Sequence, residues 1–423
     1  MKIAYVTTYD AKDVRNWSGL GYFIWQSLVQ SGIEVEFIGP LFLPSFTNRV
    51  LRMKQRFYTK ILRKLYLSEH DVIVSKDYSR EAWKRLANSK DIEAVVCPGT
   101  IPVAFLPGKL PLVTIEDATH KLLFDTYPSF KNLCRASRHN GDQIQQSAIR
   151  RSSASVFSSD WAATSAVRDY KANPEKVHVV PFGANFENQP ARENVIRAIN
   201  SRNFEQIRLL FIGVEWERKG GPVALQVVRT LAKLGVSAHL TIIGCNPAIS
   251  EEDTGYVTVR GFIKKTSEGQ QEIFDEFYKT HFLIVPSVAE CYGLVYCEAG
   301  AFGVPSIGRN VGGVGTIIKN DVNGRLFDLH NSPKDITDWI LGYFRKPERY
   351  RQLALSSLEE YESRLNWKVA GQKLKEILTN VIANKPSKVV KMVRIAGLEP
   401  AHLAALPPQS SVSANSTICA TVR

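Results

Sequence analysis

Short runs of apolar residues alternate along this chain with longer segments in which apolar residues recur at helical spacing. The first run covers residues 3–8 and is followed by a loop with glycine, a periodic segment at residues 22–31 and a second run at residues 34–38. A strand, a helix and a strand in this order predict a β-α-β unit with a parallel sheet. Similar short runs extend this predicted sheet at residues 94–97, 112–115, 155–158 and 177–180.

The same pattern begins again after a polar stretch at residues 188–202. Strand-like runs that end in glycine cover residues 208–213 and 239–244, and two further runs cover residues 282–286 and 305–308. Strands that alternate with helices in two separate series indicate two parallel sheets joined by a linker. The chain is therefore predicted to be an α/β protein with two Rossmann-like domains.

The predicted domain limits come from changes in composition. Pro181-Phe182-Gly183 closes the first half and places a rigid residue and a permissive one where a hinge is expected. From about Lys391 onward Pro, Ser, Ala and Thr dominate and no apolar period remains, which predicts disorder. We expect a first domain over residues 1–187, a second over 188–366, a helix that packs back towards the first domain over 367–388, and a disordered tail over 389–423.

Composition narrows the class of protein. The sequence has no run of about 18 uninterrupted apolar residues, and its start has the pattern of a strand, so we expect a cytoplasmic protein. Its six cysteines form no CxxC pair and lie near no group of histidines, which favours reduced thiols over disulfides or a zinc site. No Asp-x-Asp follows a predicted strand, so we expect neither a metal nor another cofactor.

The formal net charge is +13, which favours an anionic partner such as nucleic acid, an acidic membrane surface or a phosphorylated substrate. The densest basic run, Arg49 to Tyr66, holds seven Lys or Arg and no acidic residue. Its apolar residues recur roughly at helical spacing, as in a helix that lies on anionic lipid. A solvated basic helix packed on its own domain explains the segment Arg49–Lys64 equally well, and both interpretations stay open.

The most informative segment covers residues 285–313. A predicted strand ends at Pro286, a loop presents Glu290, and Gly293 opens a helix that contains Glu298. The first amide groups of this helix, at Gly293, Leu294 and Val295, have no partner within the helix and form an anion site suited to a diphosphate. Two carboxylates on either side of such a site can accept hydrogen bonds from the hydroxyl groups of a sugar or a ribose.

This segment closely resembles the signature of glycosyltransferase family 4, also called group 1. In that signature a Glu-x7-Glu element follows a Pro-Ser pair, here residues 286–287, and precedes Gly-Val-Pro and Gly-Gly, here residues 303–305 and 312–313. The resemblance implies the GT-B fold, in which two Rossmann-like domains face each other across a cleft. It also implies that Glu290 faces the transferred sugar and that Glu298 binds the ribose of the donor nucleotide.

A second segment, residues 209–221, consists of a predicted strand and a basic turn at the start of a helix. Arg218 and Lys219 follow the carboxyl end of the strand, where they can bind two phosphates and stabilise the charge of a leaving diphosphate. Many members of the resembled family carry an Arg directly after the glycine that ends the strand. This chain has Val214 there, so Arg218 has to replace it. The alternative is that both cations are surface charges at a helix start.

The same resemblance implies a ligand-binding role for two further segments. Gly19-Leu20-Gly21 follows the first predicted strand and opens a helix, so its backbone can approach a ligand closely. It resembles the glycine loop of the family's first domain, which closes over the donor diphosphate. Residues 259–263 occupy the position at which relatives hold the nucleotide base, which implies that Gly261, Phe262 and Ile263 line a base pocket.

Asp117 and His120 follow the predicted strand at residues 112–115, whose carboxyl end would face the cleft. Many relatives place a His close to the reacting carbon at the corresponding strand end, and Asp117 occupies that position here. Either Asp117 or His120 can accept or orient the hydroxyl of an acceptor. Asp117 as the cap of the following helix is an equally good explanation.

The resemblance of these segments to the family implies a retaining hexosyltransferase that uses a UDP- or GDP-sugar, and the lack of Asp-x-Asp after a predicted strand indicates that it is metal-independent. The expected acceptor is a carbohydrate or a lipid-linked molecule in polysaccharide, lipopolysaccharide or glycolipid synthesis, and the expected place is the cytoplasm or the inner face of the membrane. A sugar-nucleotide epimerase or a phosphorylase on the same fold is the alternative. A nucleic-acid-binding protein is disfavoured, because such a protein would carry clustered aromatic residues beside its Lys and Arg.

Overall fold

A computed structural model describes residues 1–264 and 266–384. All of these residues belong to one compact unit. The tail predicted over residues 389–423 and the last four residues of the returning helix predicted over residues 367–388 lie outside the described residues.

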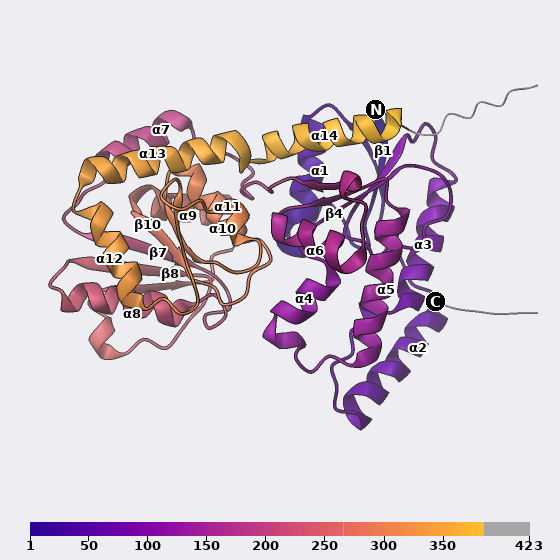
Figure 1. Ribbon diagram of the computed structural model, residues 1–423, viewed down its shortest axis with the longest axis horizontal. Helices are drawn as coiled ribbons and strands as arrows, with labels where there is room; N and C mark the ends of the chain where they lie inside the picture. The colour runs from indigo at the N-terminus through magenta and orange to yellow at the C-terminus, as the bar shows by residue number, and fades with distance from the viewer. Residues whose placement is uncertain (265, 385–423) are drawn as a thin grey trace, which may run out of the picture. The chain divides into compact units, whose positions relative to one another are not determined.

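The first half of the chain forms a six-stranded parallel sheet in the order β2-β1-β3-β4-β5-β6 (Figure 1). Its central strands are almost uninterrupted runs of buried apolar residues, as expected where helices cover both faces of a parallel sheet. Its strands are β1 (Lys2–Val6), β2 (Glu34–Ile38), β3 (Ala94–Pro98), β4 (Leu112–Glu116), β5 (Ala154–Phe157) and β6 (Val177–Val179).

The second half repeats this design with the order β12-β11-β10-β7-β8-β9, again with every pair of neighbours parallel. The four residues of β10 are all fully buried. This sheet consists of β7 (Ile207–Ile212), β8 (Ala238–Ile243), β9 (Val257–Gly261), β10 (Phe282–Val285), β11 (Ser306–Arg309) and β12 (Gly324–Phe327).

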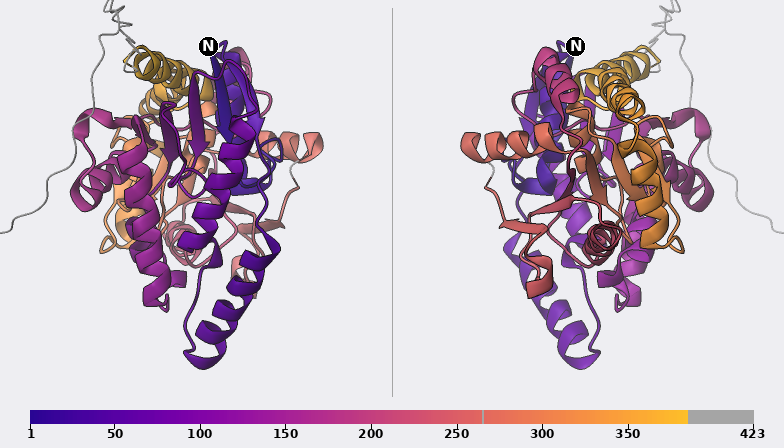
Figure 2. Two further views of the ribbon diagram at one scale, coloured as in Figure 1. Left: turned by 90° about the vertical axis from the view of Figure 1, so that its right-hand side faces the viewer. Right: turned by 90° about the vertical axis from the view of Figure 1, so that its left-hand side faces the viewer.

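Helices flank both sheets (Figure 1, Figure 2). In the first half they are α1 (Leu20–Gln30), α2 (Ser45–Arg56), α3 (Val72–Leu86), α4 (His120–Thr126), α5 (Arg135–Arg151) and α6 (Asp160–Tyr170). In the second half they are α7 (Arg192–Ser201), α8 (Gly221–Lys233), α9 (Ser267–Lys279), α10 (Leu294–Ala301), α11 (Val314–Ile317), α12 (Pro333–Phe344), α13 (Pro347–Arg364) and α14 (Trp367–Ala383).

The two predicted parallel sheets are confirmed, and the ten predicted strands agree with the observed ones to within about two residues at each end. The sequence pattern does not predict β9 and β12. Exposed residues interrupt the apolar pattern of β9, and β12 begins at a glycine, so neither has the continuous apolar pattern of the central strands. The helix expected in the basic run begins earlier, at Ser45, and continues after α2 as the short turn η2 (Phe57–Ile61).

Helix α14 belongs to the end of the described chain but packs against α1, close to the start of the sequence (Figure 1). Its first residue, Trp367, is 6% exposed and stacks on Phe23 of α1 and on Phe182 of the linker. The indole nitrogen of Trp367 donates a hydrogen bond of 2.9 Å to the side chain of Asn185. One aromatic side chain thus joins the returning helix, the first helix and the linker.

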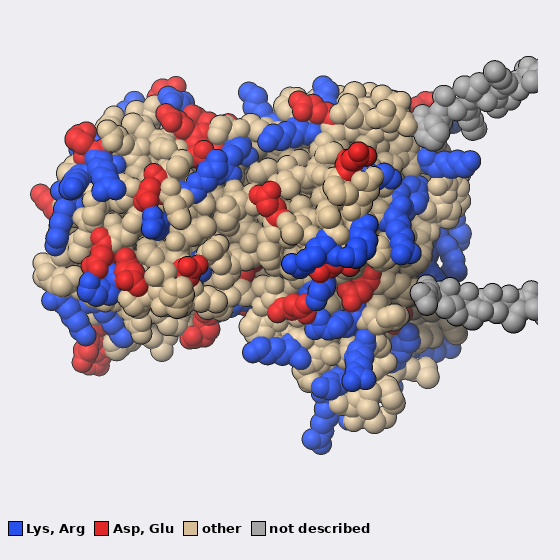
Figure 3. Space-filling view, in the orientation of Figure 1, with Lys and Arg blue, Asp and Glu red and all other residues tan. Residues whose placement is uncertain are grey.

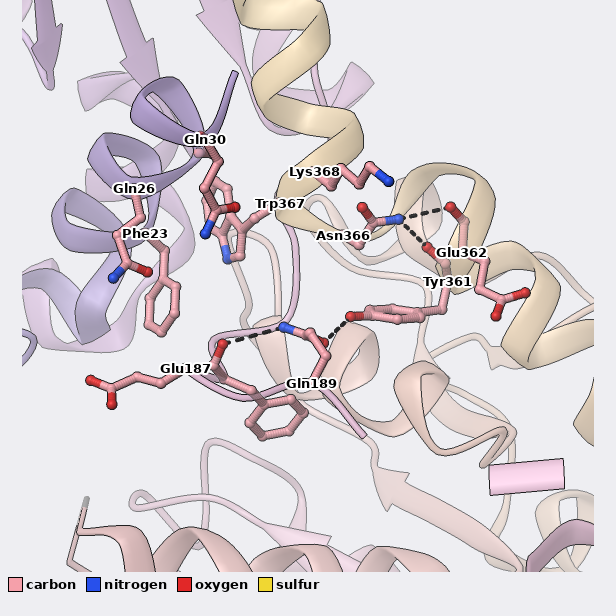
Figure 4. A pocket seen from close by; sticks show the side chains of 12 residues that line it. Phe23, Gln26, Gln30, Glu187, Gln189, Tyr361, Glu362, Asn366, Trp367 and Lys368 are labelled. Atoms are coloured by element: carbon pink, nitrogen blue, oxygen red, sulfur yellow. Dashed lines mark hydrogen bonds between the residues drawn. The ribbon is translucent and has the colours of Figure 1, made fainter. Parts of the chain in front are cut away.

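A pocket of about 320 Å³ opens beside this joint. Phe23, Gln26 and Gln30 of α1 line it together with Trp367 and Lys368 at the start of α14, and Figure 4 shows Trp367 beside the α1 residues. The linker closes another side of the pocket, where Tyr361 of α13 donates a hydrogen bond to Gln189 (Figure 4). The side chain of Asn366 caps α14 by accepting a hydrogen bond of 3.0 Å from the amide of Val369.

Replacing Trp367 tests how much these contacts contribute to the stability of the protein. We expect Trp367→Ala to lower the free energy of unfolding by about 3–5 kcal/mol, because a buried ring is removed from three elements at once. Trp83→Ala is the matched control, because Trp83 is 38% exposed and should cost much less. Urea unfolding followed by circular dichroism measures both, and equal losses would show that Trp367 has no special role.

Candidate functional site

The candidate site begins at the carboxyl end of β7, where a turn leads into α8. Lys219 in this turn forms an ion pair with Glu290, which follows β10. Glu290 is 7% exposed and also accepts a hydrogen bond of 3.3 Å from the hydroxyl of Ser287. A carboxylate taken out of water needs such partners, and the structure supplies a cation and a hydroxyl.

Arg218 lies beside this pair and holds the two loops together. Its guanidinium donates a hydrogen bond of 2.8 Å to the carbonyl oxygen of Ala289, and its Nη1 lies 3.9 Å from Glu290 Oε2. A further ion pair of 2.7 Å joins Arg218 to Glu215. The structure therefore places Arg218 and Lys219 together at the carboxyl edge of the sheet, next to Glu290.

Helix α10 begins after this loop, and Gly293 is its N-cap with a left-handed φ of 98°. Leu294 is the first residue of the helix and Val295 the second, so the predicted start of the helix is confirmed. The Gly-Gly pair predicted to follow has a packing role. A Cβ at Gly312 would lie 1.7 Å from the carbonyl oxygen of Glu290, so only glycine allows this close approach.

Glu298 lies in the second turn of α10 and lines a cavity of about 640 Å³. Phe262, Ile263, Gly213 and Val214 line the same cavity. A Cβ at Gly213 would lie 3.0 Å from Cγ of Lys219, so Lys219 lies beside a glycine that lines the same cavity as Glu298. Gly261 ends β9 one residue before the lining residues, with a φ of 68°.

Residues of the first half and of the linker also border this cavity. Asn185 and Glu187 of the linker line it together with Val14. Asn185 donates a hydrogen bond of 2.9 Å to the carbonyl oxygen of Ser18, in the loop that precedes Gly19. Asn185 has no chemical signal in the sequence, because only the folded chain brings it to the cavity.

The predicted glycine loop has an unusual backbone. Trp17 and Ser18 both adopt positive φ, and Gly19 is the N-cap of α1 with a φ of 90°. Gly21 lies in the first turn of α1, where a Cβ would come within 2.3 Å of the hydroxyl oxygen of Tyr9. Both glycines are thus required by the local packing, whatever ligand the loop receives.

Asp117 directly follows β4, and the cap of the next helix is Thr119, whose hydroxyl accepts a hydrogen bond from the amide of Leu122. Asp117 is therefore not the helix cap. The ring of His120 is buried, and its Nδ1 lies 2.6 Å from the carbonyl oxygen of Gly141 in α5. Because His120 is held between α4 and α5, Asp117 is the better placed of the two for contact with a ligand.

The environment of Asp117 changes its acidity. Burial raises its pKa to about 6, and the negative charge of Glu290 contributes to the rise. The preceding residue, Glu116, is 4% exposed and accepts a hydrogen bond of 3.0 Å from Gln145. Burial raises the pKa of Glu116 to about 8, so this carboxyl is largely protonated at neutral pH.

One residue near the site carried no signal in the sequence. Tyr127 ends α4, and its hydroxyl accepts a hydrogen bond of 3.2 Å from the amide of Cys291. The guanidinium of Arg218 lies 5.1 Å from the centre of the Tyr127 ring, within the range of a cation-π contact. Tyr127 therefore connects the first half of the chain to the loop that carries Glu290.

Two searches of the described residues gave negative results. Residues 1–264 and 266–384 contain no group of three or more His, Cys, Asp or Glu side chains arranged to hold a metal ion. Within the same residues, none of the helices combines the length and the apolar composition that crossing a membrane requires.

Comparison with known proteins gives one family match, which lies in the second half of the chain. Residues 206–345 match the family model described as "Glycosyl transferases group 1". A D-inositol 3-phosphate glycosyltransferase of Xylanimonas cellulosilytica is 26% identical over 58% of this chain and 61% of its own length. One of Saccharomonospora viridis is 25% identical over 54% of this chain and 56% of its own length. The chain thus matches little more than half the length of these curated relatives.

Solved structures resemble the fold over almost the whole described chain. Sucrose-phosphate synthase from Thermosynechococcus elongatus aligns with a TM-score of 0.63 and 14% identity, over 90% of this chain and 99% of its own. WaaG, a glycosyltransferase involved in lipopolysaccharide biosynthesis, aligns with a TM-score of 0.56 and 14% identity, over 89% of this chain and 99% of its own. These likenesses confirm the GT-B fold that the sequence predicted.

The raised pKa of Glu116 gives a testable pH dependence of stability. The folded protein keeps this proton up to about pH 8, whereas an ordinary Glu loses it near 4.5, so the stability from this group falls as the pH rises between these values. Glu116→Gln keeps the acceptor for Gln145 and removes the titration. We expect its free energy of unfolding to decline less steeply than that of the wild type over this range.

Urea unfolding at a series of pH values measures the slope. Glu251→Gln is the matched control, because Glu251 is exposed and should leave the slope unchanged. Identical slopes for the wild type and Glu116→Gln would contradict the assigned burial of this carboxyl.

Proposed function

We propose that this chain, which is similar to the group 1 glycosyl transferases, transfers a hexose from a nucleoside diphosphate sugar to a hydroxyl of an acceptor. The observation that carries the proposal is that Lys219 lies beside Gly213, directly after β7, and that Gly213 and Glu298 line the same cavity. A cation and a carboxylate at one cavity suit a diphosphate and the ribose next to it.

In this proposal the donor occupies the cavity of about 640 Å³. The base lies along Phe262 and Ile263, beside Gly261 at the end of β9, and the ribose hydroxyls donate hydrogen bonds to Glu298. The diphosphate extends from there towards Lys219 and Arg218, where the amide groups of Gly293, Leu294 and Val295 lie at the start of α10.

The chemistry follows from the charges around Glu290. Negative charge grows on the diphosphate as its bond to the sugar breaks, and Lys219 and Arg218 stabilise that charge in a site partly shielded from water. Glu290 holds hydroxyls of the sugar and keeps both cations in place. Gly19 and Gly21 form the loop that closes over the donor. Two cations and a helix start supply the positive charge, so the proposal includes no metal and no other cofactor.

The acceptor approaches from the first half of the chain. Asp117 accepts a hydrogen bond from the acceptor hydroxyl, and the leaving diphosphate can take the proton on the same face of the sugar, so the configuration is retained.

We include a UDP- or GDP-sugar as the donor and a carbohydrate or a lipid-linked molecule as the acceptor. The expected setting is polysaccharide, lipopolysaccharide or glycolipid synthesis in the cytoplasm or at the inner membrane face, with contact through Arg49–Lys64. We also propose that the boundary between the first domain and the second lies at residue 187.

The donor site is tested by Lys219→Ala and Glu298→Ala. Each variant loses a charged hydrogen-bond partner of the donor, so we expect the dissociation constant for the donor nucleotide to rise by about ten- to a hundredfold. Titration calorimetry with UDP and with GDP measures the binding. Lys233→Ala and Glu193→Ala are the matched controls, because both residues are exposed and lie outside the cavity.

The same titrations identify the base, since the wild type should prefer one of the two nucleotides. Circular dichroism checks that each variant is folded. Donor binding at the wild-type level in both folded variants would remove Lys219 and Glu298 from the site.

The role of Asp117 is tested by the pH dependence of transfer. Asp117 has a pKa of about 6 and carries a charge above that pH, so the rate of the wild type should fall as the pH is lowered through 6. Asp117→Asn cannot gain this charge, and we expect a loss in kcat of about a hundredfold. The acidic limb of the pH profile, which is the fall in rate at low pH, should also be lost. Asp125→Asn on α4 is the control, since Asp125 is 44% exposed and paired with Lys121. An unchanged acidic limb in Asp117→Asn would assign the titration to another group.

A further inference from the structure

Large apolar side chains are exposed in one short part of the first half of the chain. Across the described residues, fourteen large hydrophobic side chains are exposed, and six of them lie between residues 42 and 62. Single exposed apolar residues are normal on a protein surface, whereas a contiguous group marks a site of contact. The six residues are Phe42, Phe46, Met53, Phe57, Ile61 and Leu62.

These residues do not belong to a poorly packed helix, because α2 has a separate packed face. Leu51 and Thr47 are buried, and the hydroxyl of Thr47 donates a hydrogen bond of 2.5 Å to Asp77 on α3. Lys54 forms an ion pair of 2.7 Å with Asp71, the N-cap of α3. The inward face of α2 is therefore complete, and the exposed apolar residues lie on the face turned away from it.

Basic residues alternate with the exposed apolar ones on this outward face. Arg49, Arg52, Arg56, Lys60 and Arg63 are exposed, and no ion pair is recorded for any of them within the described part of the chain. The sequence has no Asp or Glu from Phe37 to Ser68. In Figure 3 the lowest part of the molecule, where Figure 1 places α2, shows Lys and Arg among neutral residues and no acidic side chain on the visible face.

We propose that this surface, formed by residues 42–63 and called here the α2 surface, docks on a lipid bilayer that contains anionic lipid. Phe46, Met53, Phe57 and Ile61 enter the boundary between headgroups and acyl chains, and the arginines between them bind the headgroup phosphates. A helix that carries apolar and basic side chains in this alternation lies in the plane of the membrane interface. Docking thus depends on insertion of apolar side chains as well as on charge.

The chemistry of the surface favours a bilayer over nucleic acid. Arginines could bind the phosphates of either partner. Met53, Ile61 and Leu62, however, gain little from stacking on bases, whereas they lose contact with water when they enter lipid. The apolar residues also extend over the whole length of α2 and into η2, as an extended contact with a flat boundary requires.

The α2 surface is firmly joined to the part of the fold that carries Asp117. Asp71, which binds Lys54 of α2, also accepts a hydrogen bond of 2.5 Å from Tyr66. The residue before Asp71, His70, has its ring centre 4.6 Å from that of His120, at the start of α4 and three residues after Asp117. Docking would therefore fix the orientation of the first half of the chain relative to the membrane.

Sedimentation with vesicles tests the proposal on the full chain without donor or acceptor. Vesicles of phosphatidylcholine alone are compared with an equal mixture of phosphatidylcholine and phosphatidylglycerol. The wild type should bind the mixture much more tightly. Replacing Arg49, Arg52 and Arg56 together by Gln should lower the partition on the order of a hundredfold, since each cation near an anionic surface contributes about 1 kcal/mol, or about fivefold. Replacing Lys233, Arg345 and Lys346 together by Gln is the matched control and should have no effect.

Insertion of apolar side chains is tested separately from charge. Phe57→Ser combined with Ile61→Ser keeps every cation and should lower the partition by about tenfold or more. Leu234→Ser combined with Leu329→Ser is the control, because these residues are 56% and 59% exposed on the other half of the chain. A Phe57→Trp variant should show a blue shift of its added fluorescence when vesicles are present, and a Leu234→Trp variant should not.

Three results would overturn the proposal. The first is a wild type that does not sediment with the anionic vesicles. The second is a Phe57→Ser/Ile61→Ser variant that binds as tightly as the wild type. Binding would then depend on charge only, and the apolar side chains would not insert. The third is tighter binding to a single-stranded oligonucleotide than to the vesicles, lost in the arginine variant. Because the vesicle assay contains no donor, a failure of the proposed transferase activity leaves its result unaffected.

Discussion

The chain passes between its two sheets twice, and the two passages come closest at Gly183 and Trp367. A Cβ at Gly183 would lie 2.3 Å from the backbone nitrogen of Trp367 and 2.6 Å from the carbonyl carbon of Asn366. Only a residue without a side chain allows the linker and the start of α14 to lie this close. Trp367 then stacks on Phe182 and Phe23, so the packing holds the first helix, the linker and the last helix together.

This joint fixes which edges of the sheets face each other. In a parallel sheet all strands end at the same edge, so β4 presents Asp117 where β7 and β10 present Lys219 and Glu290. The contact between Tyr127 and the amide of Cys291 shows that the loops at these edges touch. Two cations and a carboxylate are thus held in place before a ligand arrives, which is the arrangement that stabilises a developing charge without reorganisation.

Much of the fold could be predicted from the sequence because it follows from local patterns. Strands buried on both faces are continuous apolar runs, and β3 and β10 are of this kind. Helix starts carry their own signals, such as Gly293 before α10. β9 and β12 were missed because partial exposure and a glycine weaken the apolar pattern, and pairing with β8 and β11 places these two strands in the sheet. The amphipathic character of the basic run was visible, but which of its apolar residues face solvent depends on packing against α3.

The candidate residues divide in the same way. Spacing and the family resemblance together singled out Glu290, Glu298, Arg218 and Lys219 as candidates, because they follow a strand or lie near a helix start in two short segments. The sequence left Asp117 and His120 as alternatives, and only the packing of α5 against α4 turned His120 inward. Asn185 and Tyr127 have no local signal, because their neighbours lie far away in the chain. The local sequence determines which side chains lie at the end of a strand. Contacts between segments distant in the chain determine which of these side chains come together in the site.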